Sequence, residues 1–490
     1  MWLGGLAACW GVAVAIVYFQ AGLTLSHYDA KGHLVVARRI LDSLTPGWLQ
    51  VGAVWLPLPH LLNLLPVQVD ALYRTGASAV AISIASFALL VYASARFTLA
   101  ATASAVAAVT TALLIASNPN LLYLQSTPMT EPLLLGLVAL GLTLTFEGLH
   151  EGRDRLTRAG FVVLALACLT RYEAWPITGA AVAAVVLAGW RAGASWPYSF
   201  RRAARLALIP AVGILWFFVH SKATVGAWFV TDGFYVRDPT YQAKPLAALG
   251  AVWWGTRQLG SEALAHAAAI SAIALLIVWW RRPRASALIV AVAWIGACAL
   301  AWYAFYAGHP LRIRYMVPAV AGAGALTGVA LGMLPRRWQV PVAIVLLLSV
   351  WAEARPFDAH AAMVLEAQWD RPRSIARRAV TTCLPPPGQG EVIMASMGSL
   401  AHYMQELASS GYSLNDFLHE GNGDLWLGAL NGPDRYVRWI LIEEVSEGGD
   451  MLAERERSDP RFLTGFTRIC SGGGVSLYKN SAKWEVRSAK

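Results

Sequence analysis

The stretch SHYDAKGHLVVARRILDS, residues 26–43, follows directly on the first long apolar segment of the chain. It places an aspartate, a lysine and two histidines at the mouth of a membrane helix, where ionisable side chains are costly and are candidates for function. Apolar residues recur at helical spacing from Leu34 to Leu41, which predicts a helix lying along the membrane surface. We expect Asp29 at the N-cap of that helix, with His33 further along the same face.

The composition identifies a polytopic membrane protein. Hydrophobic residues make up 57% of the 490 residues and charged residues 14%, which excludes an ordinary soluble protein. Charge-poor runs long enough to cross a bilayer recur through residue 354, and we expect about eleven transmembrane helices. The expected spans are roughly 3–25, 73–95, 98–117, 128–147, 159–176, 176–191, 203–220, 264–281, 285–306, 315–334 and 338–354. The first has no basic n-region or small-residue cleavage site, so we interpret it as a retained span.

The charge balance divides the chain in two. Residues 1–354 carry 24 Lys and Arg against 12 Asp and Glu, whereas residues 355–490 carry 15 against 17. The division predicts a transmembrane domain, residues 1–354, followed by a small α/β domain, residues 355–490. Since the net positive charge belongs to the membrane part alone, nucleic acid is not an expected partner.

The α/β domain has recognisable elements. The runs 391–396 and 437–445 read as strands, 399–411 as a helix ending in glycine, and 465–480 as a hairpin. Its two cysteines, Cys383 and Cys470, would form a disulfide in an oxidising compartment, although two buried free thiols fit the sequence equally well.

The short loops predict the orientation. Five short loops on one side hold 13 Lys and Arg, while those on the other side hold three. The positive-inside rule makes the basic side cytoplasmic, so the N-terminus is expected inside. The first loop, 26–72, the loop 221–262 and the α/β domain then lie outside the cytoplasm. The loop 221–262 has the size of an active-site lid.

Ionisable residues near the membrane gather on this outer side. Arg171 and Glu173 lie in CLTRYEAWP, residues 168–176, and Glu131 lies in the first turn of a predicted span. Residues two apart do not face each other on a helix, so each needs a partner from another segment. The alternatives are a structural ion pair for the first two and a helix-start carboxylate for Glu131.

A short outer turn, YAGHPLRIRYMVP at 306–318, holds His309, Arg312, Arg314 and Tyr315. Two arginines there oppose the usual charge bias and call for a reason. Forked guanidinium groups suit a phosphate ligand, and contact with anionic lipid headgroups is the competing explanation.

Four motifs together resemble a known superfamily. YDAKGH in the first outer loop, TEP at a later span, LTRYEAW and RIRYMVP follow one another in this order. They resemble the GT-C glycosyltransferases, closest to the bacterial relatives of the protein O-mannosyltransferases and the aminoarabinose transferase. The resemblance covers roughly residues 1–354.

The resemblance implies a membrane transferase that passes a hexose or pentose from a polyprenyl-phosphate donor to an extracytoplasmic lipid, glycan or protein. It implies Asp29 as the catalytic carboxylate, and arginines that hold the donor phosphate. The residues expected to bind the donor are Lys31, His33, Glu131, Arg171, Glu173, His309, Arg312, Arg314 and Tyr315.

No cofactor is certain. Several members use two nearby acids to hold a divalent metal, whereas Ala30 and Lys31 follow Asp29 here. Asp29 would be the metal ligand if a divalent ion is used. If the sugar is transferred in a single displacement, the configuration at its anomeric carbon would be inverted. The alternative function is a transporter or flippase for a lipid-linked saccharide, which would have charges at the midplane and paired half-helices.

Overall fold

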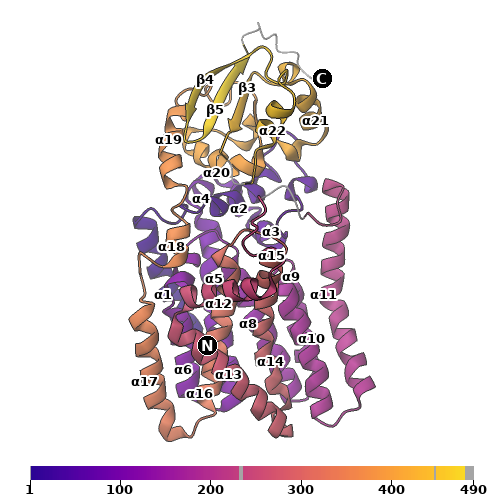
Figure 1. Cartoon of the computed structure of the whole chain (residues 1–490), viewed down its shortest axis with the longest axis vertical. Helices are drawn as coiled ribbons and strands as arrows, with labels where there is room; N and C mark the ends of the chain where they lie inside the picture. The colour runs from indigo at the N-terminus through magenta and orange to yellow at the C-terminus, as the bar shows by residue number, and fades with distance from the viewer. Residues whose placement is uncertain (1, 231–235, 446–447, 481–490) are drawn as a thin grey trace.

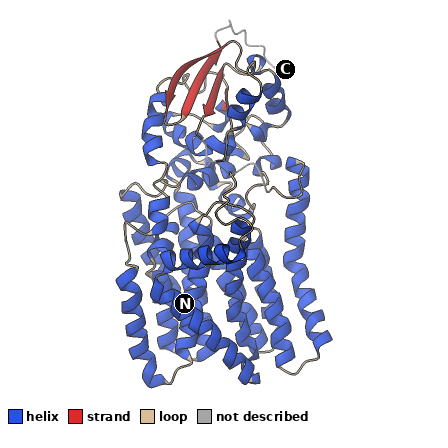
Figure 2. Cartoon of the chain, viewed as in Figure 1, coloured by secondary structure: helices blue, strands red, loops and turns tan. Residues whose placement is uncertain are grey.

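The computed structural model describes residues 2–230, 236–445 and 448–480. A long bundle of helices forms one end of the molecule, and a small domain with a sheet forms the other (Figures 1 and 2). The bundle and its connections contain α1 Trp2–Gln20, α2 Tyr28–Arg39, α3 Leu58–Asn63, α4 Asp70–Thr75, α5 Ala77–Thr102, α6 Ala105–Ala116, α7 Pro119–Leu124, α8 Glu131–His150, α9 Asp154–Cys168, α10 Ala174–Arg191, α11 Trp196–Val225, α12 Pro245–Gly260, α13 Glu262–Arg281, α14 Ile289–Val292, α15 Ala297–Tyr306, α16 Val317–Gly332, α17 Arg336–Glu353 and α18 Ala362–Glu366. Short 3₁₀ turns in this part are η1 Trp48–Val51, η2 Pro66–Gln68, η3 Pro283–Leu288, η4 Ala293–Gly296 and η5 Ile313–Met316.

Eight helical segments among the described residues are long and apolar enough to cross a membrane. They are α1, α5, α8, α10, α11, α13, the segment Pro283–Tyr306 and the segment Ile313–Gly332. The other three expected spans correspond to α6, α9 and α17. The first two have 12 and 15 residues, too few at 1.5 Å per residue to cross about 30 Å alone. The third carries two arginines and a glutamate at its ends. The protein is therefore a mostly helical, multi-pass membrane protein.

The sheet domain, defined here as the described residues from α19 onward, contains five strands in the order β2-β1-β3-β5-β4. Its elements are α19 Arg371–Thr381, β1 Ile393–Ala395, α20 Met397–Leu407, η6 Ala408–Ser410, η7 Leu414–Asp416, β2 Phe417–Leu418, η8 Glu420–Asn422, α21 Asp424–Asn431, η9 Pro433–Arg435, β3 Trp439–Glu443, α22 Met451–Ser458, β4 Phe466–Gly472 and β5 Val475–Asn480. β1 is parallel to β2 and β3, while β5 is antiparallel to β3 and β4.

The predicted strands, helix and hairpin of this domain are confirmed. Gly473 and Gly474 form the hairpin turn with φ of 62° and 85°, a conformation that glycine adopts without strain. A Cβ at Gly473 would collide with the backbone of α19, so the turn packs directly on that helix. β2 was not predicted, because two residues are too few to show an alternating pattern.

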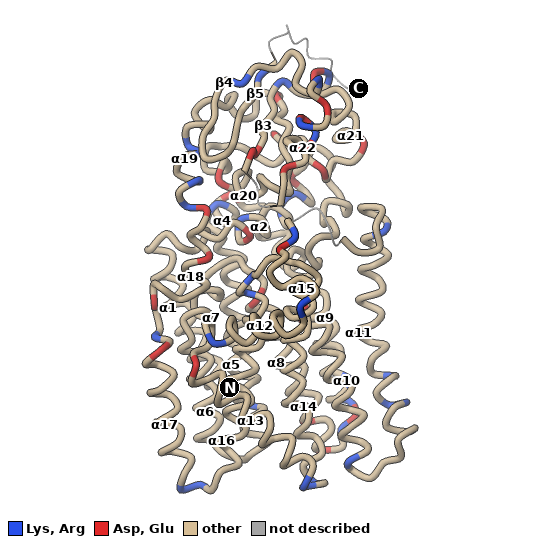
Figure 3. The backbone as a smooth tube through the Cα atoms, viewed as in Figure 1, with Lys and Arg blue, Asp and Glu red and all other residues tan. Residues whose placement is uncertain are grey.

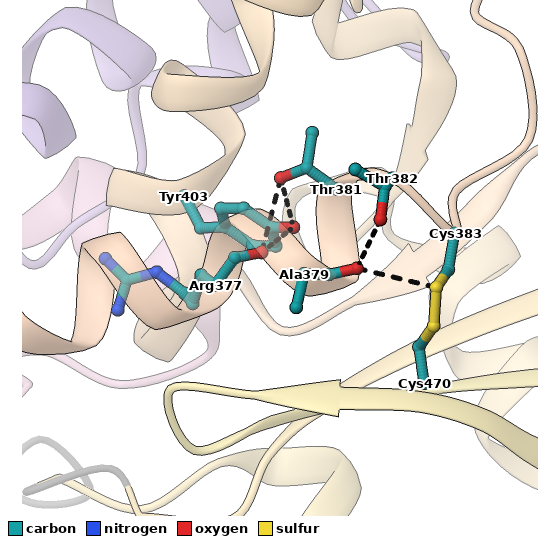
Figure 4. The surroundings of a disulfide bond; sticks show 7 residues. All are labelled: Arg377, Ala379, Thr381, Thr382, Cys383, Tyr403 and Cys470. Atoms are coloured by element: carbon teal, nitrogen blue, oxygen red, sulfur yellow. Dashed lines mark hydrogen bonds between the residues drawn. A yellow bond between two sulfur atoms is a disulfide. The ribbon is translucent and has the colours of Figure 1, made fainter.

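A disulfide joins Cys383, just after α19, to Cys470 on the edge strand β4 (Figure 4). The two Cα atoms are 6.4 Å apart, and 87 residues separate the cysteines in the sequence. Of the two alternatives for this pair, the structure contains the disulfide. The bond fixes the end of α19 against the sheet.

The helix α2 lies between the bundle and the sheet domain (Figure 1). Leu34, Val35 and Ala37 share a hydrophobic core with the sheet domain, in which Leu400 and Met404 of α20 take part. The sequence predicts a helix on the membrane surface, and the structure differs because its apolar face is covered by protein. A further correction concerns its start: His27, not Asp29, is the N-cap, and Asp29 is the second helical residue.

The prediction that Arg171 and Glu173 lie on one helix is wrong. α9 ends at Cys168 and α10 begins at Ala174, so residues 169–173 form a turn. Spacing rules for a helix do not apply to a turn, and the two side chains do contact each other. Glu131 is confirmed in the first turn of its helix, α8.

Charged residues lie mainly in the sheet domain, at its junction with the bundle, around the level of α12 and at the far ends of the helices (Figure 3). The middle of the bundle is mostly uncharged, as hydrocarbon requires. The loop 221–262 contains α12, and its residues 231–235 lie outside the described part of the chain. Its predicted role as a lid is a hypothesis still to be tested.

Candidate functional site

Two groups of buried charges lie on the side of the bundle that faces the sheet domain. The first is the acid–arginine pair, defined as Asp29 and Arg314. Asp29 is near the start of α2, and Arg314 lies in η5 immediately before α16. The Asp29 carboxylate and the Arg314 guanidinium form an ion pair across 285 residues of sequence. Their side chains are only 10% and 12% exposed, so the pair joins two elements in a place with little water.

Asp29 is held in its ionised form. Burial by itself would raise the pKa of the Asp29 carboxyl, but the Arg314 guanidinium, with His27 and His33, outweighs burial and lowers that pKa well below its usual range. The group is therefore a carboxylate at neutral pH. A carboxylate fixed on a helix end can accept a proton, provided that the arginine leaves one oxygen free.

A buried histidine and a second carboxylate lie beside this pair. His27 Nδ1 accepts a hydrogen bond from the backbone N–H of Asp29 at 3.1 Å, so a neutral imidazole carries its proton on Nε2. His27 Nε2 lies 3.4 Å from Glu366 Oε1, and both side chains are buried. Burial would raise the pKa of Glu366, whereas His27 and Arg314 lower it. Glu366 thus adds negative charge near Arg314.

The second group is the Arg171 triad, defined as Glu131, Arg171 and Glu173. Arg171 Nη1 lies 2.9 Å from Glu131 Oε1, and Arg171 Nη2 lies 2.7 Å from Glu173 Oε1. The Glu131 contact is an ion pair without hydrogen-bond geometry. Arg171 Nη1 also donates to the hydroxyl of Thr130 at 3.1 Å. One guanidinium is therefore shared by two buried carboxylates.

His33 is close enough to interact with charges of both groups. Its Nδ1 is 3.1 Å from His60 Nε2, and the ring of Trp55 packs on it with a centroid distance of 4.1 Å. Burial, together with His60, holds the pKa of His33 well below its usual value. Burial and Arg39 lower the pKa of His60 to about 3. Both rings are therefore neutral near pH 7.

The turn 306–318 contributes a second aromatic–histidine contact. Tyr315 hydroxyl lies 3.1 Å from His309 Nε2, and His309 Nδ1 is 2.8 Å from the carbonyl oxygen of Pro310. Because Nδ1–H must donate to that carbonyl, the Tyr315 hydroxyl donates to Nε2. The Arg312 guanidinium lies 6.0 Å from the centre of the Trp369 ring, and Arg312 is buried.

Lys31 points away from these groups and into the sheet domain. Its Nζ lies 2.5 Å from Glu406 Oε1 on α20, although 375 residues separate them in sequence. Its expected contact with the donor phosphate stays a prediction. Within the described ranges no three His, Cys, Asp or Glu side chains converge as metal ligands would. Whether a divalent ion is used, with Asp29 as a ligand, is a question for experiment.

The structure thus brings ten sequence-predicted residues to one junction in separate small contacts. Asp29 contacts Arg314, Arg171 contacts both Glu131 and Glu173, and His309 contacts Tyr315. Sequence reasoning did not identify the partners His27, His60, Glu366 and Glu406. An isolated glutamate in an ordinary helical pattern carries no local signal, so only the fold could reveal the last two.

No protein-family model and no curated protein matches this sequence. Solved structures do. The structure of ArnT from Cupriavidus metallidurans bound to undecaprenyl phosphate is 16% identical, with a TM-score of 0.59 over 96% of this chain and 97% of that one. Its apo form gives a TM-score of 0.58. The apo oligosaccharyltransferase of Archaeoglobus fulgidus is 11% identical, with a TM-score of 0.51 over 98% of this chain and 74% of that one.

Both neighbours are GT-C superfamily members, and the likeness extends over nearly the whole chain. At such low identity it establishes the fold alone. The expected GT-C-like architecture, with a small sheet domain after the helical bundle, is therefore confirmed.

Proposed function

We propose that this protein is a membrane glycosyltransferase that moves a sugar from a polyprenyl-phosphate donor to a lipid, glycan or protein acceptor. The observation that carries the proposal is the acid–arginine pair, a buried carboxylate joined to a guanidinium where the bundle meets the sheet domain. A structural neighbour with the same fold, ArnT, is seen bound to undecaprenyl phosphate. The two supports are independent, because one is local chemistry and the other is overall fold.

The residues suit an in-line displacement at the anomeric carbon. Asp29 would take the proton of the acceptor hydroxyl as its oxygen forms a bond to that carbon. The bond from the carbon to the phosphate oxygen breaks, and the polyprenyl phosphate leaves with the electron pair. Arg314 would stabilise the charge that develops on the phosphate. One displacement of this kind inverts the anomeric centre.

The ion pair suggests an order of events. The Arg314 guanidinium pairs with the carboxylate of Asp29. A phosphate presents several charged oxygens to a guanidinium and competes with the carboxylate for the same N–H donors. When the donor phosphate takes Arg314, the carboxylate is freed to act as a base. Donor binding would therefore precede productive acceptor binding.

The sidedness is part of the proposal. The basic short loops predict that the sheet domain lies outside the cytoplasm, in the cell membrane that holds the bundle. The disulfide between Cys383 and Cys470 supports this placement, because such bonds persist in oxidising compartments. A reporter fused after residue 490 should be active only if it is exported.

The test is transfer in proteoliposomes. The purified protein is given radiolabelled polyprenyl-phosphate sugars, with a membrane extract as the source of acceptor. Wild type should yield a labelled acceptor. Asp29→Asn should yield none, although the variant should still bind the labelled donor. Glu391→Gln is the matched control, since Glu391 pairs with Arg438 inside the sheet domain.

Transfer by Asp29→Asn at the wild-type rate would exclude Asp29 as the base. Movement of intact labelled lipid across the bilayer, without a new glycosidic bond, would favour the transporter. The product's anomeric configuration, read by nuclear magnetic resonance, decides between inversion and retention. Activity after exhaustive chelation would argue against a required divalent ion.

A further inference from the structure

The sheet domain is joined to α2 by an apolar contact and by polar ones. The apolar face of α2 contributes to the core of the sheet domain, as described above. The neighbouring helix α4 is held as well, because Gln405 Nε2 of α20 donates to the backbone oxygen of Tyr73 at 3.1 Å. Asp42, just after α2, accepts hydrogen bonds from the backbone N–H of Leu414 and Asn415 at 3.3 and 3.2 Å. These contacts make α2 as much a part of the sheet domain as of the bundle.

A chain of alternating charges crosses the same junction. Lys31 Nζ lies 2.5 Å from Glu406 Oε1, and Arg377 Nη2 lies 3.3 Å from that oxygen. Arg377 also forms a forked contact with Asp370, at 3.0 and 2.5 Å. Ser374 donates to the same oxygen of Glu406 at 2.9 Å. We call Lys31, Glu406, Arg377 and Asp370 the junction network.

The junction network is buried at its centre. The Arg377 side chain has no exposed surface, and Lys31 is only 9% exposed. Burial would raise the pKa of Glu406, but Lys31 and Arg377 lower it, so the group is ionised. Buried charges of this kind fix geometry strongly, since removing one partner leaves another charge without compensation.

The network is itself held in place by the fold of the sheet domain. Arg377 lies on α19, against which the hairpin turn at Gly473 packs without room for a Cβ. The disulfide secures the end of α19 to β4, and the Tyr403 hydroxyl donates to the backbone oxygen of Arg377 (Figure 4). The anchor of Lys31 is thus rigid.

We propose that the sheet domain positions Asp29 through the junction network, with Lys31, Glu406 and Arg377 as positioning residues. Lys31 is two residues after Asp29 on the same short helix, so a contact that fixes Lys31 also fixes the rotation of α2. The inference rests on the proposed function only for its activity readout. It gives Lys31 a role that differs from the phosphate contact expected from the sequence.

The two roles of Lys31 predict different results. If Lys31 held the donor phosphate, Lys31→Met would weaken donor binding and Glu406→Gln would not. If the network positions Asp29, both variants lower kcat and leave the donor Kd within about twofold. Glu406→Gln should have the larger effect, because it leaves Lys31 without its partner, whereas Lys31→Met leaves Glu406 beside Arg377.

The experiment measures hydrogen exchange of the α2 amides in the full chain, in nanodiscs, together with transfer kinetics. Compared are wild type, Lys31→Met, Glu406→Gln, the double variant and the control Glu391→Gln. We expect α2 to exchange at least about tenfold faster in Glu406→Gln, with partial recovery in the double variant, because no charge is then left unpaired. The control should match wild type in both readouts.

Wild-type exchange of α2 in both single variants would overturn the inference, and so would faster exchange with an unchanged kcat. A fall in donor affinity that occurs only in Lys31→Met would show that Lys31 binds the donor phosphate. If wild type transfers no sugar at all, the proposed function fails. The exchange data would then still decide whether the network fixes α2.

Discussion

The acid–arginine pair and the Arg171 triad are built from the same kinds of side chain, carboxylates and guanidinium groups, in different numbers. In the pair, one carboxylate meets one guanidinium, and the two come from α2 and η5. In the triad, one guanidinium is shared by two carboxylates, and one of them, Glu131, is completely buried. The pair is neutral, whereas the triad keeps one negative charge.

The difference suggests that the arginine of the pair can exchange its carboxylate for another anion, whereas the arginine of the triad cannot. In the proposed mechanism the donor phosphate would replace Asp29 on Arg314, because its charged oxygens also pair with a guanidinium. The released carboxylate would then take the proton of the acceptor. A phosphate approaching Arg171 meets two carboxylates that already neutralise it, and repulsion opposes binding. We therefore propose that the pair binds the ligand and that the triad joins α8 to the turn between α9 and α10.

The largest expected effect is on the rate of transfer. Asp29→Asn should lower it by about a hundredfold to ten-thousandfold, the usual contribution of a general base. Glu173→Gln makes the same carboxylate-to-amide change in the triad and should lower it by less than about tenfold. The assay is transfer in proteoliposomes at saturating donor. Similar losses in both variants would remove the distinction between the two groups.

The next effect is on stability. Arg171→Met leaves Glu131 and Glu173 buried beside each other without a cation, which should cost about 3–5 kcal/mol. Thermal unfolding in detergent should show a clearly lower Tm than for wild type. Adding Glu131→Gln and Glu173→Gln to this variant should recover most of the loss. A wild-type Tm for Arg171→Met would mean that the triad does not join the helices.

A smaller effect concerns donor affinity. Arg314→Lys keeps the positive charge but loses the fork, so the Kd for polyprenyl phosphate should rise about tenfold. Arg171→Lys should leave that Kd within about twofold. Binding is measured by titration calorimetry in nanodiscs. An equal loss of donor affinity in the two variants would show that Arg171 also binds the donor phosphate, as the sequence predicts.

The smallest effect is the pH dependence of stability that comes from the buried histidines His33 and His60. Burial lowers the pKa of His60 from 6.5 to about 3 in the folded protein. Between these values the unfolded chain binds a proton that the folded one does not, so stability falls as pH falls below 6.5. One such group contributes at most about 1.4 kcal/mol per pH unit. Tm measured from pH 7 to pH 5 should fall less steeply for His60→Gln than for wild type.

Several parts of this molecule can be predicted from the sequence, because their signals are local. Hydropathy finds the apolar helices, and alternation with turn residues finds β3 and the hairpin of β4 and β5. The outer-loop arginine Arg314 and the acid Asp29 are found because charges at the membrane edge are rare. Their presence in the same junction follows from topology, although their direct contact does not.

Other parts have no local signal. The turn 169–173 contains no glycine or proline that would mark it, so the sequence looks like continuous helix there and the contact of Arg171 with Glu173 is missed. Glu406 lies in an ordinary amphipathic helix far along the chain, and nothing near it indicates Lys31. Such partners depend on how the sheet domain docks, which is a tertiary property.

The disulfide of the sheet domain has a consequence for the biogenesis of the protein. If the domain lies outside the cytoplasm, as proposed, both cysteines follow the transmembrane helices in the chain and meet an oxidant only after the sheet domain has been exported. The support of α19, and with it the anchor of Lys31, is then completed after membrane insertion has ended. Maturation of the site would be coupled to translocation, so a half-inserted chain would be inert.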